Sequence, residues 1–246
     1  RAFLAAELAT LGRRPVLVAR SGDDAEALHR DLCTFLGLDP ERAADRGVLF
    51  LGADEKSPYE EYSPDARAVM ERINTLHRLS RAPAEVRALI VTPQALIRRH
   101  VPPAFFGRFG EYVLAGEEID REHLTERLTL SGYNAVSAVE DPGTFSVRGG
   151  IVDVFSPSRS RPIRIDLFGD EVERLHLFDP STHRNLHDLE DAELLPAREV
   201  AYDPETTKRA RARPAAHAAA RLRPRRRVHA LLADVDHHIH FFGTEA

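Results

Sequence analysis

The sequence has few of the residues that build disulfide bonds, cysteine-ligated metal sites and membrane spans. It contains one cysteine, Cys33, and no tryptophan in 246 residues. A single cysteine excludes an internal disulfide and a zinc site made of cysteines, and its place in a helical pattern predicts a packing role. No segment approaches the roughly 18 consecutive apolar residues of a membrane span, and no secretory signal pattern follows the first residue. These absences predict a chain of the reducing cytoplasm with no membrane contact.

The machinery for nucleotide binding and catalysis is also incomplete. Residues 52–57 end in the Lys-Ser pair of a phosphate-binding loop, but Glu55 occupies the position of the second glycine. The acidic pair at 170–171 imitates a magnesium site, yet strand residues follow at once, which favours a hairpin turn. The histidine cluster at 237–240 has no carboxylate to support a metal site. We therefore predict no catalytic residue, metal or cofactor in this chain, which is not expected to be an enzyme.

The net charge of −5 conceals a strongly basic segment. Nine Lys or Arg and no acidic residue lie between Lys208 and Arg227. One interpretation is weak, nonspecific contact with DNA or with an acidic partner. The other is a solvated Ala/Arg-rich helix or loop, which we favour because no aromatic residue is interleaved to stack on bases.

Residues 1–115 alternate between strand and helix patterns. The short apolar runs at 15–19, 48–51 and 88–91 predict buried strands. Helix starts are indicated by Ser21, by Ser63–Pro64 and by Thr92–Pro93, and Gly37 is a helix stop. Strands that alternate with helices predict an α/β domain with a parallel sheet covered on both faces.

Residues 116–198 show a different pattern. Asp120 is the predicted cap of one helix, and extended segments follow at 136–139, 145–147, 151–155, 163–168 and 172–178. Residues 168–171 form a predicted hairpin turn around Gly169. We expect a small α+β domain inserted into the first domain, with residues 199–246 as a basic, helical return to it.

The segment at 163–168 alternates in a way that gives its outward face an unusual composition. Ile163, Ile165 and Leu167 are predicted to face the core, opposite Arg164, Asp166 and Phe168. Arginine together with an aromatic residue is typical of an interaction hot spot. The alternative is that Phe168 folds over the edge of its own domain, and the strand pattern leaves both interpretations open.

Several strings resemble a known family. Five strings resemble the interaction domain shared by the excinuclease component UvrB and transcription-repair coupling factor. They are VRGGIVDVF at 147–155, IRIDLFGDEVE at 163–173 and the strings at 132–136, 140–145 and 177–182. Residues 58–65, 91–96, 193–199 and 241–245 are similar to the N-terminal region of the coupling factor. UvrB carries a phosphate-binding loop and a tyrosine-rich hairpin, and neither is found here. The resemblance thus favours the coupling factor and implies a degenerate nucleotide-binding-type fold.

The resemblance also implies a function. It implies docking of the excinuclease component UvrA at Arg148, Arg164 and Phe168, with recruitment to stalled RNA polymerase in nucleotide excision repair. We expect Arg164→Ala to weaken that binding by about 2–4 kcal/mol without unfolding the domain. In the full-length family the same surface contacts the C-terminal domain, and ATP and magnesium belong to a motor absent from this chain. The alternative is a fragment of the ATP-dependent excinuclease component UvrB or of a helicase that contacts damaged DNA.

Overall fold

The computed structural model describes residues 1–52, 65–200 and 208. Four features predicted from the sequence lie outside the described residues. They are the string at 52–57 beyond Gly52, the helix start at Ser63–Pro64, the basic segment beyond Lys208 and the histidines at 237–240. Within the described residues, no helix is long and apolar enough to cross a lipid bilayer.

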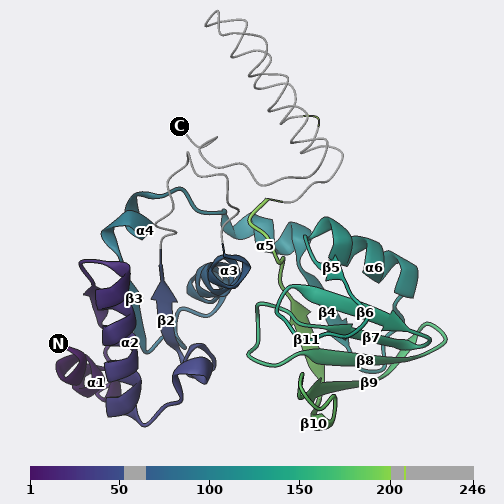
Figure 1. Ribbon diagram of the computed structural model, residues 1–246, viewed down its shortest axis with the longest axis horizontal. Coiled ribbons are helices and arrows are strands. Elements are labelled where there is room, and N and C mark those ends of the chain that lie inside the picture. Colours follow the sequence, from purple (N-terminus) through teal and green to yellow (C-terminus); the bar gives the residue numbers. More distant parts are fainter. Residues whose placement is uncertain (53–64, 201–207, 209–246) are drawn as a thin grey trace, which may run out of the picture.

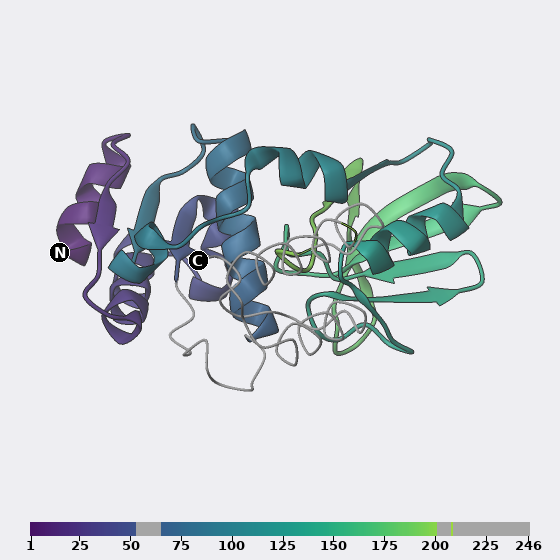
Figure 2. The ribbon, with the colours of Figure 1, turned by 90° about the horizontal axis from the view of Figure 1, so that it is seen from above.

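The first lobe is a small parallel α/β sheet. Its strands β1 (Val16–Val18), β2 (Val48–Leu51) and β3 (Ala88–Val91) are arranged in the order β1-β3-β2, all parallel. Helices α1 (Ala2–Thr10) and α2 (Gly22–Leu36) pack on one face, and α3 (Ala66–Arg81) packs on the other, as Figures 1 and 2 show. The predicted α/β class and the covering of both faces are confirmed.

One prediction for this sheet is wrong. The run at 15–19 is predicted to be a buried strand, but β1 is an edge strand in which Val16 is 61% and Val18 is 53% exposed. The apolar composition of a strand does not reveal its position in the sheet, because strand order depends on pairing between distant segments.

The local start and stop signals are mostly confirmed. Ser21 Oγ accepts a hydrogen bond from Asp24 N–H at the start of α2, and Gly37 ends the helix with a φ of +66°. Thr92 caps α4 (Pro93–Ile97) in the same way. Helix α3 is capped by Asp65, whose carboxylate accepts a hydrogen bond from the Arg67 N–H.

The second lobe contains a larger, mostly antiparallel sheet. The helices on either side of β4 are α5 (Pro103–Phe109) and α6 (Arg121–Leu130). Two short 3-10 helices, η1 (Pro40–Arg42) and η2 (Ala44–Arg46), lie between α2 and β2 of the first lobe. The six strands have the order β10-β9-β8-β7-β6-β5, and a two-stranded sheet pairs β11 with β4. Their bounds are β4 (Glu111–Leu114), β5 (Asn134–Ala135), β6 (Thr144–Arg148), β7 (Ile151–Val154), β8 (Ile163–Phe168), β9 (Glu171–Phe178), β10 (Asn185–Leu189) and β11 (Asp191–Leu194).

The six-stranded sheet buries one face against α6 and the β4–β11 pair (Figure 1). This inner face includes Val152, Ile163 and Ile165, each fully buried, and Leu128 of α6. The predicted hairpin is confirmed, with Phe168 paired to Glu171 and Gly169 at a φ of +65°. The opposite side of the sheet is called the outer face below.

One extended segment predicted for this lobe is wrong. Residues 136–139 do not form a strand, and β5 ends at Ala135. Val136 and Val139 instead pack on Phe155 and Phe178 at one end of the outer face. Their apolar character therefore reflects burial in a loop rather than strand pairing.

A buried ion pair and a histidine–carboxylate contact connect the two lobes. Arg72 of α3 is 2% exposed and donates through Nε and Nη2 to the two carboxylate oxygens of Glu199, each at 2.7 Å. His77 Nε2, also on α3, lies 3.0 Å from Glu193 Oε1 of β11. Because bidentate pairs fix orientation as well as distance, these contacts set α3 against the second lobe.

The Glu193–His77 contact predicts an acid-sensitive link between the lobes. His77 holds the pKa of Glu193 below its ordinary value of 4.5, although burial opposes the shift. Since the folded pKa is lower than the unfolded one, the stabilisation is complete above pH 4.5 and is lost as the pH falls through the folded pKa.

We expect Glu193→Gln to flatten the decline in unfolding midpoint below about pH 5, because the glutamine cannot be protonated in this range. Thermal unfolding measured by circular dichroism at several pH values checks this, with Glu7→Gln on the exposed side of α1 as the control. An unchanged pH profile for Glu193→Gln contradicts the assignment.

Candidate functional site

The candidate site is a row of polar residues across the outer face of the six-stranded sheet. The strand register places these residues opposite one another: Ser146, Asp153, Arg164, His176 and Asp188. Because side chains alternate between the two faces of a strand, they all lie on the side opposite the core. A polar row in the middle of a sheet is costly to bury unless its members bind one another.

Asp153 lies at the centre of this row and is 0% exposed. The Arg164 guanidinium donates two hydrogen bonds to the Asp153 carboxylate, from Nε to Oδ1 at 2.8 Å and from Nη2 to Oδ2 at 3.0 Å. Arg148 adds a third bond from Nη2 to Oδ2 at 2.6 Å. A carboxylate removed from water is therefore held by two guanidinium groups, which compensates its charge.

Arg164 is engaged by its own domain on every side. Its side chain is 14% exposed, its Cζ lies 4.7 Å from the centre of the Phe178 ring, and its Nη1 donates to Asn185 Oδ1 at 3.0 Å. The hydrogen bond to Asp153 raises the pKa of the Arg164 guanidinium, against the effect of burial. We therefore revise the expectation that Arg164→Ala leaves the fold intact, because this change would strand the buried Asp153 carboxylate.

Arg148 and Phe168 remain accessible. The Arg148 side chain is 49% exposed at the end of β6, and Phe168 is 78% exposed at the end of β8. Arg148 precedes the β6–β7 turn and Phe168 precedes the β8–β9 turn. These turns lie at the same end of the sheet, since the N–H of Leu167, beside Phe168, donates to the carbonyl of Gly150 in the β6–β7 turn at 2.7 Å. The structure thus brings Arg148 and Arg164 together on Asp153 and leaves Phe168 at the same end of the sheet as an exposed aromatic side chain.

His176 extends the network toward β10. Its Nε2 lies 3.2 Å from Asp166 Oδ2 and its Nδ1 lies 2.8 Å from Asp188 Oδ1, with the His176 side chain 8% exposed. The sequence interpretation missed Asp153 and His176. Each is a single polar residue between apolar residues of a strand. This pattern could have indicated a buried polar side chain, which needs a hydrogen-bond partner.

The placement of metal-ligating and thiol side chains bears on other kinds of chemistry. In the part of the chain that the structure describes, no group of three or more His, Cys, Asp or Glu side chains is placed to hold a metal ion. Cys33 is fully buried, and burial raises the pKa of its thiol, which disfavours the reactive thiolate. The arrangement instead presents a charged and aromatic surface on a rigid sheet, as suits a protein interface.

Comparison with known proteins agrees with this arrangement. The UvrB interaction domain family matches residues 113–200, which include the end of β4, α6, the six-stranded sheet and β11. The transcription-repair-coupling factor of Myxococcus xanthus is 43% identical over 195 residues, 79% of this chain and 16% of the relative. Those of Escherichia coli K12 and Bacillus subtilis 168 are 31% and 30% identical, over 82% and 85% of this chain and 17% of each relative.

The chain spans about a sixth of the length of these curated relatives. The match nevertheless extends over both lobes, since it covers about four fifths of the chain, and the family match covers the lobe that carries the outer face. The chain is therefore similar to the transcription-repair-coupling factors over about four fifths of its length, and its residues 113–200 match the UvrB interaction domain.

Proposed function

We propose that this chain is a non-catalytic docking module that binds the excinuclease component UvrA through the outer face of its six-stranded sheet. In this role it recruits UvrA to stalled RNA polymerase during nucleotide excision repair. The similarity to transcription-repair-coupling factors supports the repair context, and the match to the UvrB interaction domain supports a protein–protein role for the second lobe. The observation that carries the proposal is the exposure of Arg148 and Phe168 at one end of a sheet that also holds a buried Arg164–Asp153 pair.

The Asp153 network supports docking by holding the face in one conformation. An interface side chain that is already ordered loses little conformational entropy on binding, which favours affinity. Arg148 is ordered by its bond to Asp153 while about half of its side chain stays in solvent. Its guanidinium is thus placed to donate further hydrogen bonds to a carboxylate of the partner.

The proposal assigns nucleotide chemistry to other parts of the full-length protein. We infer that ATP and magnesium act in a motor outside this chain, and that the outer face contacts the C-terminal domain of the full-length protein when UvrA is absent. The chain would act in the cytoplasm, where repair of transcribed bacterial DNA takes place. Both contacts would use the same surface, so they would exclude each other.

Calorimetric titration of the 246-residue chain into purified UvrA tests the proposal. We expect saturable binding that weakens as salt is added, because charged groups contribute to the interface. Circular dichroism on the same sample establishes that the chain is folded. The absence of binding heat at several temperatures with a folded chain would contradict the docking role.

A further inference from the structure

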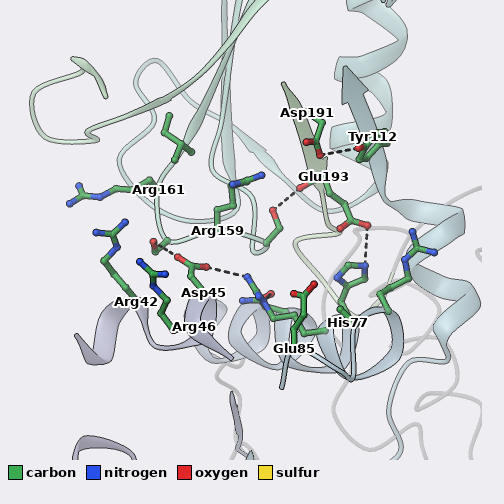
Figure 3. A pocket seen from close by; sticks show the side chains of 17 residues that line it. Arg42, Asp45, Arg46, His77, Glu85, Tyr112, Arg159, Arg161, Asp191 and Glu193 are labelled. Atoms are coloured by element: carbon green, nitrogen blue, oxygen red, sulfur yellow. Dashed lines mark hydrogen bonds and ion pairs between the residues drawn. The ribbon is translucent and has the colours of Figure 1, made fainter. Parts of the chain in front are cut away.

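A second polar site lies in a cleft between the two lobes (Figure 3). The cleft has a volume of about 470 Å³ and is lined by α3, η1 and η2 on one side and by β11, β4 and the loop before β8 on the other. It lies outside the row of polar residues on the outer face. Its size is within the range of sites for small ligands, about 300–1,000 Å³.

The cleft is rich in arginine. Six arginines contribute to its lining: Arg42, Arg46, Arg78, Arg81, Arg159 and Arg161. Figure 3 shows Arg42 and Arg46 on one wall and Arg159 and Arg161 on the other. The two walls come from segments more than a hundred residues apart, so the folded arrangement of the two lobes creates the cluster.

Two of these arginines are already neutralised within the chain. Arg78 Nη2 lies 3.2 Å from Asp45 Oδ1, and Arg161 Nη1 lies 2.9 Å from Asp179 Oδ2. Among the residues described, Arg42, Arg46, Arg81 and Arg159 have no ion-pair partner.

Most of the acidic side chains in the cleft are committed to other groups. Asp45 pairs with Arg78 and accepts a hydrogen bond from Ser160 Oγ at 2.9 Å. Asp191 accepts from the Tyr112 hydroxyl at 2.9 Å, and Glu193 lies beside His77. Glu85, on the α3 side, is the remaining carboxylate of the lining. The lining therefore holds six arginines against four carboxylates, a formal excess of positive charge.

We propose that this cleft binds a small phosphate-bearing ligand of nucleotide size through Arg42, Arg46 and Arg159. Guanidinium groups match phosphate oxygens with parallel hydrogen bonds, and they stay charged at every physiological pH. Like charges that line one cleft repel one another, and a bound anion offsets that repulsion. Because the three arginines come from both lobes, the bound ligand would also bridge the lobes and stabilise their arrangement.

The test uses pyrophosphate as the probe and the 246-residue chain as the protein. Calorimetric titration of wild type is compared with the double variant Arg46→Gln/Arg159→Gln and with Arg13→Gln/Arg14→Gln, a matched control at exposed positions just after α1. We expect the cleft variant to lose about tenfold or more in affinity and the control to change by less than about twofold. The unfolding midpoint of wild type should rise with pyrophosphate, and that of the cleft variant should rise less.

Two further ligands identify the source of the phosphate. ADP should bind at least as well as pyrophosphate, and a single-stranded oligonucleotide should not bind better than either. Absence of pyrophosphate binding to wild type at about 10 mM would overturn the proposal. Equal binding by the cleft variant would overturn the assignment of the arginines, and preferential binding of the oligonucleotide would replace a small ligand with nucleic acid.

Discussion

Replacing Asp153 with alanine is expected to lower the free energy of unfolding by about 3–5 kcal/mol. The Asp153 carboxylate is fully buried and accepts hydrogen bonds from both Arg164 and Arg148. Its removal leaves the Arg164 guanidinium 14% exposed and without its counter-charge in the middle of a sheet. Burial of an unpaired charge is among the few changes that cost this much.

Urea unfolding followed by circular dichroism measures this effect. Asp170→Ala provides the control because Asp170 is exposed in the β8–β9 turn, and it should change stability by less than about 0.5 kcal/mol. A loss below about 1 kcal/mol for Asp153→Ala would show that the network does not hold the sheet together. The same experiment on Arg164→Ala should also show a loss of stability, because that variant strands the other member of the pair.

Replacing Phe168 with alanine is expected to weaken binding to UvrA by about 2 kcal/mol or more, roughly 30-fold. Phe168 is 78% exposed and precedes a glycine turn, so its removal opens no cavity in the domain. Its ring is the large apolar group at the same end of the sheet as Arg148, and aromatic and arginine side chains carry most of the energy of typical interfaces. The stability of the chain should therefore be unchanged while the affinity falls.

Phe3→Ala is the matched control for this prediction. Phe3 is 58% exposed on α1 of the other lobe, where its ring lies 5.5 Å from that of Phe35. Surface plasmon resonance with immobilised UvrA should detect the loss mainly as faster dissociation of the Phe168 variant. A similar loss for both variants would mean that exposed aromatic residues bind without regard to position.

Features determined by local sequence could be predicted. Ser21 and Gly37 bound a helix because a capping hydroxyl and a left-handed glycine act within a few residues. The alternation at 163–168 predicts Ile163 and Ile165 in the core and Phe168 at the surface, as the structure confirms. The family resemblance identifies the interaction domain because its strings are long and occur in one order.

Features that depend on pairing between distant segments could not be predicted. The partner of Arg164 is Asp153 on the neighbouring strand, and only the register of β7 and β8 brings them together. Strand order likewise leaves Val16 at an exposed edge. The sequence places Arg42 and Arg159 far apart, so the cleft they share follows from the packing of the two lobes. In each case the composition of a segment is informative about its own conformation and not about its neighbours.

The most direct test of the account is calorimetric titration of UvrA with wild type and with the double variant Arg148→Ala/Phe168→Ala. Phe168 is exposed, and Asp153 keeps both of its bonds from Arg164 when Arg148 is replaced, so circular dichroism should show a folded chain. We expect at least about a hundredfold loss of affinity for the double variant, with wild-type binding retained by Phe3→Ala. Equal affinity of wild type and the folded double variant would contradict the claim that the outer face is the docking surface.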